Sequence, residues 1–261
     1  MKRYFGDRCN MKRCLLPPIL VLLMLIVLKL PALAQSDVVV TLEVNGPITP
    51  AMTGYLERGI ESAETSNAQA VIILMDTPGG LLEATQDIVQ LLRSAEVPVV
   101  VYITPRGAQA ASAGSIITMA GHAAAMAPET VIGAASPVGE NGVDLEETLF
   151  RKVSEDLKAT VRNLTAARGR DATALAEAMI DDARAVTADE ALESGLIDFI
   201  ADDVDDLLLQ LDGVTLNVND APYTLRTAEA VENHVAASPV EQILLALANP
   251  ILLGILLAVG I

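Results

Sequence analysis

The chain has 261 residues, of which 52% are hydrophobic, so it is long enough for one domain with a sizeable core. Its net charge of −17 gives a surface that repels phosphate backbones and anionic headgroups. We therefore expect no nucleic-acid binding, and any membrane contact should be hydrophobic. With only two histidines and two cysteines, no metal-ligand cluster is visible, and we expect no metal and no cofactor.

Residues 1–34 have the order of a secretory signal peptide: basic residues, then an apolar run, then a small-residue cleavage site at 32–34 (ALA). The alternative is a retained membrane anchor, but Lys29 within the apolar run and the cleavage site favour removal. Either Met1 or Met11 is the start. Both cysteines lie in this segment, and its removal leaves 11 basic and 33 acidic residues, a net charge of −22. The soluble part should then lie on the outer side of the cytoplasmic membrane.

The first half of the remaining chain alternates strand and helix patterns. Residues 38–44, 70–76 and 99–103 are short β-branched or aliphatic runs, which are typical of buried strands. Helical spacing covers 51–63, with Thr49 as a possible cap, and 81–92. Strand, turn, helix and strand in this order predict a βαβ unit.

The pattern continues to about residue 205, so 35–205 reads as one α/β domain. We expect a helix from Ser112, a long helix over 145–167, and a helix opened by the capping box Thr187 to Glu190. Short strands are expected at 123–126, 131–133 and 196–201.

The end of the chain has a different character. Residues 206–241 are acidic and weakly periodic, and we expect a small β extension and a tether. Residues 242–261 carry no charge and are long enough for a transmembrane segment that ends where the chain ends. The alternative is a buried hydrophobic helix at a dimer interface.

Two loops of small residues carry the candidate chemistry. The first, 77–80 (TPGG), follows a buried strand, and the second, 107–115 (GAQAASAGS), holds a serine where a strand turns into a helix. We expect Ser112 to be the nucleophile, because its small neighbours admit a substrate carbonyl. The amide of Ala113 near the helix start, with that of Gly79 or Gly80, would stabilise an oxyanion. The alternative is that small residues only permit tight helix packing.

A serine needs a base, and the chain after residue 34 offers two histidines and two lysines. His234 lies in the expected tether, and His122 lies at the far end of the helix that Ser112 begins, where contact with the helix dipole is expected. At about 100° per residue, Lys152 falls at the edge of the apolar stripe of the 145–167 helix, whereas Lys158 falls on its back. Desolvation lowers the pKa of a lysine amine, which lets the neutral form act as a base. We therefore expect Lys152 to be the base, against the alternative of a solvated ammonium group on an apolar stem.

The same residues carry a family resemblance, in chain order and over about residues 37–235. The segments that agree are 76–80 (DTPGG), 107–114 (GAQAASAG), 126–128 (MAP), 132–134 (IGA) and 187–198. They resemble the membrane-bound serine proteases of the ClpP class known as NfeD-like proteins.

The resemblance implies a ClpP/crotonase-like α/β fold of repeated ββα units and a homo-oligomer. It also implies a Ser–Lys dyad at Ser112 and Lys152, with oxyanion amides at Gly79 and Ala113 and less certainly at Gly80. A hydrophobic segment of a stomatin-like membrane protein is the implied substrate. A non-catalytic scaffold that binds such a protein is the alternative, and a crotonase-like acyl-CoA enzyme ranks last. Longer members carry further membrane spans and a small β-barrel, so we expect this sequence, which ends within its first C-terminal membrane segment, to be truncated relative to them.

Overall fold

The structure, a computed structural model, describes residues 37–139 and 142–248. Its main sheet has six parallel strands in the order β11-β1-β2-β3-β5-β8. The strands are β1 (Val38–Asn45), β2 (Ala70–Asp76), β3 (Val99–Ile103), β5 (Ala123–Met126), β8 (Phe199–Ile200) and β11 (Val231–His234). Alternate side chains of the central strands enter two separate cores, one on each face of the sheet.

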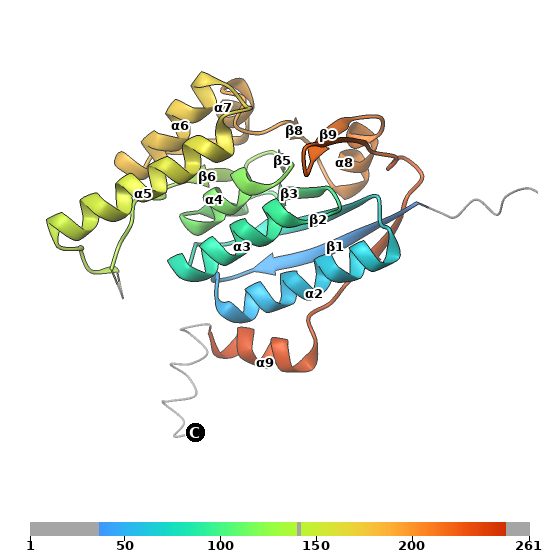
Figure 1. Cartoon of the computed structure of the whole chain (residues 1–261), viewed down its shortest axis with the longest axis horizontal. Coiled ribbons are helices and arrows are strands. Elements are labelled where there is room, and N and C mark those ends of the chain that lie inside the picture. Colours follow the sequence, from blue (N-terminus) through green and yellow to red (C-terminus); the bar gives the residue numbers. More distant parts are fainter. Residues whose placement is uncertain (1–36, 140–141, 249–261) are drawn as a thin grey trace, which may run out of the picture. The chain divides into compact units, whose positions relative to one another are not determined.

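Helices cover both faces of this sheet. Figure 1 shows α2 (Pro50–Ser66) and α3 (Leu82–Ser94) lying side by side across one face, and they pack there with α4 (Ala113–Ala120). The second face is covered by α8 (Val204–Leu211). The start of α2 is fixed by its cap, since Thr49 Oγ1 accepts a hydrogen bond from the Met52 amide. All eight residues of α4 are buried.

A second, three-stranded sheet carries the nucleophile loop. It consists of β4 (Gln109–Ala111), β6 (Val131–Gly133) and β7 (Ala185–Thr187), with β6 in the middle. β7 leads into α7 (Ala188–Glu193), whose expected capping box between Thr187 and Glu190 is confirmed. The long helix α5 (Glu147–Thr165) packs along α6 (Arg170–Asp181).

Several expectations from the sequence differ from the structure. The strands at 70–76, 99–103, 123–126 and 131–133 have the expected bounds, whereas the last expected strand shrinks to the two residues of β8. The expected helix over 145–167 begins and ends two residues short of those bounds. Neither α6 nor α8 is indicated by the sequence reading above.

The stretch after residue 205 contains the expected small β extension and is more than a tether. The hairpin β9 (Thr215–Val218) and β10 (Ala221–Thr224) lies there, and β11 joins the main sheet beside β1. The hydroxyl of Tyr55 on α2 donates to the Val235 carbonyl at 2.8 Å. This segment therefore packs on the rest of the domain through the pairing of β11 with β1 and through contacts with α2.

The last described helix, α9 (Pro239–Leu247), lies against α2. Arg58 of α2 forms a two-pronged ion pair with Glu241, with N–O distances of 3.0 and 2.6 Å. On α9, the side chains of Val240 and Ile243 are 67% and 61% exposed. No helix within residues 37–139 and 142–248 is both long and apolar enough to span a bilayer. The expected signal peptide and most of the expected transmembrane segment lie outside the described residues.

Candidate active site

Ser112 lies at the turn between β4 and α4, where it is the N-cap residue of the helix. Its backbone has φ 51° and ψ −116°, a conformation that L-residues with a side chain rarely adopt. The Ser112 amide donates to the Gly133 carbonyl of β6 at 2.8 Å, which anchors the turn. Strained backbone of this kind concentrates at functional sites because the surrounding structure holds it in place. The side chain of Ser112 is half-buried and does not cap its own helix.

The TPGG loop, 77–80, packs directly against this serine. A Cβ atom added to Gly79 would lie 2.7 Å from Ser112 Cβ and 3.2 Å from Ser112 Oγ. Gly79 also has φ 108°, which favours glycine. The two loops that the sequence singled out are therefore brought together, and a side chain at residue 79 would displace the nucleophile.

The two glycine amides of this loop differ in whether they already have a hydrogen-bond partner. The Gly79 amide donates to the hydroxyl of Thr77 at 3.1 Å, so it is already engaged. The Gly80 amide donates no hydrogen bond to any described residue, and Gly80 lines the same cavity as Ser112. Of the two expected oxyanion donors in this loop, the geometry therefore favours Gly80 over Gly79.

Ala113 is the first residue of α4, where amides lack a partner within the helix. It lines the cavity together with Ser112 and Gly80. An oxyanion formed at Ser112 would meet one amide from each loop and the positive end of the α4 dipole.

The cavity beside Ser112 has a volume of about 230 Å³ and is mostly aliphatic. Its walls come from α3, α4, α5, the segment 135–138 and the residue two positions before α5: Leu82, Thr85, Ile116, Ala135, Pro137, Val138, Leu145, Leu149, Val153 and Leu157. Such a volume suits an aliphatic side chain of modest size. The sequence indicates none of these wall residues as part of a site, although the apolar stripe of α5 is visible in its helical periodicity.

Lys152 does not reach the serine in this single chain. The stripe of α5 that lines the cavity passes through Leu149 and Val153, while Lys152 beside it is exposed to solvent. Neither its ammonium group nor any other base makes a hydrogen bond with Ser112 Oγ among the described residues. The expectation that Lys152 is desolvated is therefore wrong for the chain alone, because its side chain lies on the outer edge of the stripe.

The other lysine has structural partners. The Nζ atom of Lys158 pairs with Glu155 at 2.6 Å and with Asp181 of α6 at 3.1 Å. The hydrogen bonds to Glu155 and then Asp181 raise the pKa of Lys158. As expected, Lys158 lies away from the cavity, but its side chain faces α6 and is only 16% exposed, so the expectation that Lys152 is the more desolvated of the two lysines is reversed.

The histidines also lie away from Ser112. The Val99 amide donates to Nδ1 of His122 at 3.0 Å, so the neutral ring carries its proton on Nε2. Burial lowers the pKa of His122 from 6.5 to about 4, and the positive charge of Arg93 adds to the effect. The hydrogen bond of the ring is therefore to β3, and not to the last carbonyls of α4 that the sequence suggests. His234 is exposed on β11, with Nδ1 3.3 Å from Thr41 Oγ1.

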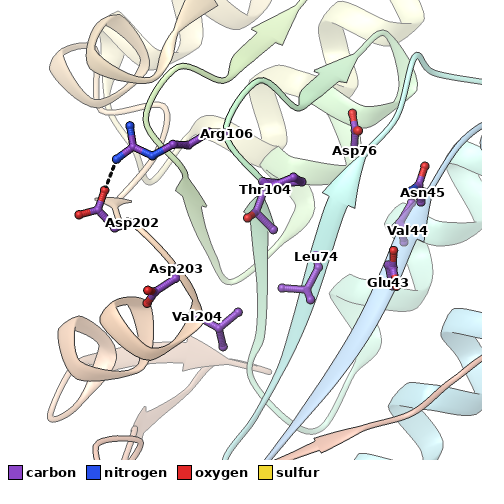
Figure 2. A pocket seen from close by; sticks show the side chains of 11 residues that line it. Glu43, Val44, Asn45, Leu74, Asp76, Thr104, Arg106, Asp202, Asp203 and Val204 are labelled. Carbon is purple, nitrogen blue, oxygen red and sulfur yellow. Dashed lines mark hydrogen bonds and ion pairs between the residues drawn. The ribbon is translucent and has the colours of Figure 1, made fainter.

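A second cavity, of about 600 Å³, lies at the carboxyl ends of β1, β2 and β3 (Figure 2). Carboxylates of Glu43, Asp76, Asp202 and Asp203 line it, and Arg106 pairs with Asp202 at 2.6 Å. It contains neither a nucleophilic hydroxyl beside a base nor the loops described above. Within the described part of the chain, no group of three or more histidine, cysteine or acidic side chains could hold a metal ion.

Comparison with known proteins adds independent findings. A family profile described as NfeD1b, N-terminal domain, matches residues 38–221. Membrane-bound protease PH1510 of Pyrococcus horikoshii is 35% identical over 248 residues, which cover 93% of this chain and 55% of that protein. Membrane protein NfeD1b of Bacillus subtilis is 30% identical over 205 residues, covering 73% of this chain and 45% of that protein. The chain thus spans about half the length of these curated relatives.

Solved structures show the same fold. A lysine-to-alanine mutant of the 1510-N membrane-bound stomatin-specific protease, in complex with a substrate peptide, matches with a TM-score of 0.74 at 32% identity, covering 80% of this chain and 97% of that one. A serine-to-alanine mutant of 1510-N matches with a TM-score of 0.71 at 33% identity, covering 78% of this chain and 99% of that one. The expected α/β fold of the ClpP/crotonase type is thereby confirmed.

Proposed function

The chain belongs to the NfeD1b N-terminal domain family, and we propose that it is a membrane-associated serine endopeptidase with a Ser–Lys dyad. The observation that carries the proposal is the strained backbone of Ser112, which lines an aliphatic cavity together with the residues of the two proposed oxyanion amides, Gly80 and Ala113. Solved relatives that are described as proteases share this fold over most of their length.

In the proposed mechanism, Ser112 Oγ attacks the carbonyl carbon of a peptide bond and passes its proton to the neutral amine of Lys152. The amides of Gly80 and Ala113 stabilise the negative oxygen of the tetrahedral intermediate. Collapse of the intermediate releases the amine product, which takes its proton from Lys152. Water then hydrolyses the acyl-enzyme by the same route.

The exposed position of Lys152 requires that something cover this side of α5 before the dyad forms. Apolar side chains that line the cavity are available for that contact, since Val138 is 64% exposed and Leu149 48%. We propose that the substrate segment, together with a second copy of the chain in a homo-oligomer, covers them. Molar mass from light scattering, with and without substrate peptide, tests the oligomer.

The substrate is proposed to be a hydrophobic segment of a membrane protein such as a stomatin-like partner. The aliphatic walls of the cavity support an apolar residue on the acyl side of the cleaved bond. The relative structures are described as stomatin-specific proteases. The uncharged sequence 242–261 supports attachment to the cytoplasmic membrane, and the basic and apolar start supports placement of the domain on its outer side.

A scaffold that binds a stomatin-like protein without cleaving it is the second candidate. The observation in its favour is that Ser112 Oγ has no base within hydrogen-bond distance among the described residues. Capture of a hydrophobic peptide by the chain, together with no cleavage over hours, would support the scaffold.

The deciding experiment measures hydrolysis of a fluorogenic hydrophobic peptide by wild type, Ser112→Ala, Lys152→Ala and the matched control Lys158→Ala. We expect Ser112→Ala to fall to the background rate and Lys152→Ala to lose about 10²–10⁴-fold in kcat. Lys158→Ala should keep wild-type kcat, because that lysine pairs on the back of α5. Wild-type activity should rise with pH as a lysine amine deprotonates. Equal rates from all four proteins would refute the dyad.

A further inference from the structure

The peptide bond between Gly79 and Gly80 is held in one orientation by donors on its carbonyl side. The Gly79 carbonyl accepts from the Ile48 amide at 2.9 Å and from the Thr77 hydroxyl at 3.3 Å. In a trans peptide the C=O and N–H bonds point in opposite directions. The Gly80 amide is therefore turned away from Ile48, towards the side on which Gly80 lines the cavity.

Gly80 itself lies flush against the segment that supplies one of these donors. A Cβ atom at Gly80 would lie within van der Waals overlap of the Ile48 carbonyl and amide. The Leu81 amide also donates to the Ile48 carbonyl, at 3.0 Å. The main chain of Ile48 thus forms hydrogen bonds with the residues on both sides of Gly80, Gly79 and Leu81.

Thr77 is the only side chain that we find bonded to this glycine pair among the described residues. It is completely buried, and its hydroxyl both accepts from the Gly79 amide and donates to the Gly79 carbonyl. Its main chain bonds to β4 on either side of residue 110, since its amide donates to Gln109 and its carbonyl accepts from Ala111. Thr77 therefore connects the TPGG loop to β4, the strand that ends one residue before Ser112.

The methyl group of Thr77 packs against the second loop, 107–115. A Cβ atom at Gly114, two residues after the nucleophile, would lie 2.5 Å from Thr77 Cγ2. The first turn of α4, at Gly114, is therefore packed against the same side chain that bonds to Gly79. One residue thus contacts both loops that supply the proposed oxyanion donors.

We propose that Thr77 is a positioning residue for the oxyanion site: its hydroxyl holds the Gly79–Gly80 peptide so that the Gly80 amide faces the carbonyl attacked by Ser112. This rests on the proposed peptidase function. Two adjacent glycines rotate easily, so without the hydroxyl only the main-chain bonds to Ile48 oppose a turn of this peptide. A turned peptide removes one oxyanion donor, whose loss costs about 10²–10³ in kcat.

The test compares Thr77→Val, which keeps the shape and loses the hydroxyl, with Thr77→Ser, which keeps the hydroxyl. We expect Thr77→Val to lose at least about tenfold in kcat with KM unchanged, and Thr77→Ser to stay within about threefold of wild type. Thr227→Val is the matched control, since Thr227 is equally buried and donates to the Leu208 carbonyl at 2.6 Å on the other face of the sheet. The control should lose stability without losing kcat.

Two binding measurements separate positioning from general damage to the fold. A peptidyl boronic acid, which places an anionic oxygen at the reacting carbon, should bind Thr77→Val more weakly by the same factor as kcat falls. The unmodified peptide should bind Ser112→Ala and the Ser112→Ala/Thr77→Val double variant equally.

The outcomes distinguish this inference from the proposed function. Wild-type kcat in Thr77→Val, or equal weakening of boronate and plain peptide, overturns the positioning role while the peptidase stands. No hydrolysis and no boronate binding by wild type overturns both.

Discussion

The lowered pKa of His122 can be tested through its effect on stability. The sequence offers this histidine as a possible base, but the structure places it away from Ser112. Replacement by asparagine keeps an acceptor for the Val99 amide and removes the titrating ring. The pKa of His122 is about 4 in the folded chain and 6.5 when the ring is exposed, so the folded state binds fewer protons between these values. Its contribution to stability is therefore complete above pH 6.5 and is lost as the pH falls towards 4.

The magnitude follows from the size of that shift. One pKa unit corresponds to about 1.4 kcal/mol, so wild type should lose about 3 kcal/mol of unfolding free energy through this ring between pH 6.5 and 4. The carboxylates titrate in both proteins, so their effects cancel in the difference between wild type and His122→Asn. The unfolding free energy of wild type minus that of His122→Asn should therefore decrease by about 3 kcal/mol from pH 6.5 to pH 4.

Urea unfolding of the purified full chain in a nonionic detergent, followed by circular dichroism at pH 7, 5 and 4, measures this difference. His234→Asn is the matched control, because His234 is exposed, and it should leave the pH profile unchanged. Parallel profiles for wild type and His122→Asn would refute the reasoning about burial. Loss of peptidase activity in a stable His122→Asn protein would instead return His122 to the list of bases.

Two further substitutions probe the nucleophile loop and the C-terminal fastening. Gly79→Ala places a methyl group against Ser112 Cβ and should lower kcat by about 10²-fold, whereas Gly169→Ala, with a similar φ of 106° and open space around it, should keep full activity in the same peptide assay. Equal losses in both would show that backbone strain, and not contact with Ser112, is responsible. Glu241→Gln should cost up to about 1 kcal/mol of unfolding free energy at pH 7, since Arg58 is partly exposed. The ion pair with Arg58 lowers the pKa of Glu241 from 4.5 to about 2, so this cost should be full above pH 4.5 and vanish towards pH 2, and a difference that ignores pH would contradict it.

The sequence predicts those parts of the fold whose signal is local. The buried strands of the parallel sheet are unbroken aliphatic runs, so their bounds agree with the structure at 70–76 and 99–103. The sequence does not indicate β11 because three of its four residues, VENH, are polar and all are exposed, and only pairing with β1 makes them a strand. That pairing joins positions almost the full length of the domain apart, which no local pattern can indicate.

The candidate site divides in the same way. The close approach of Ser112 and the TPGG loop follows from two runs of small residues, which sequence alone displays. The choice between Gly79 and Gly80 depends on the direction of one peptide plane, and that direction is set by Thr77 and Ile48. The helical periodicity of α5 indicates which edge Lys152 occupies, but it cannot indicate how far that edge lies from Ser112.

The pairing of β11 with β1 also has a mechanical meaning. The two strands are parallel, with Val38 opposite Val231 and Thr41 opposite His234. The chain therefore enters β1 at one end of the pair and leaves β11 at the other. Tension along the chain between α9 and the start of the domain loads all the ladder bonds in shear together, whereas strands pulled from one end unzip bond by bond. Force on α9 is thus resisted by the sheet and by the Arg58–Glu241 ion pair before it can reach the loops around Ser112.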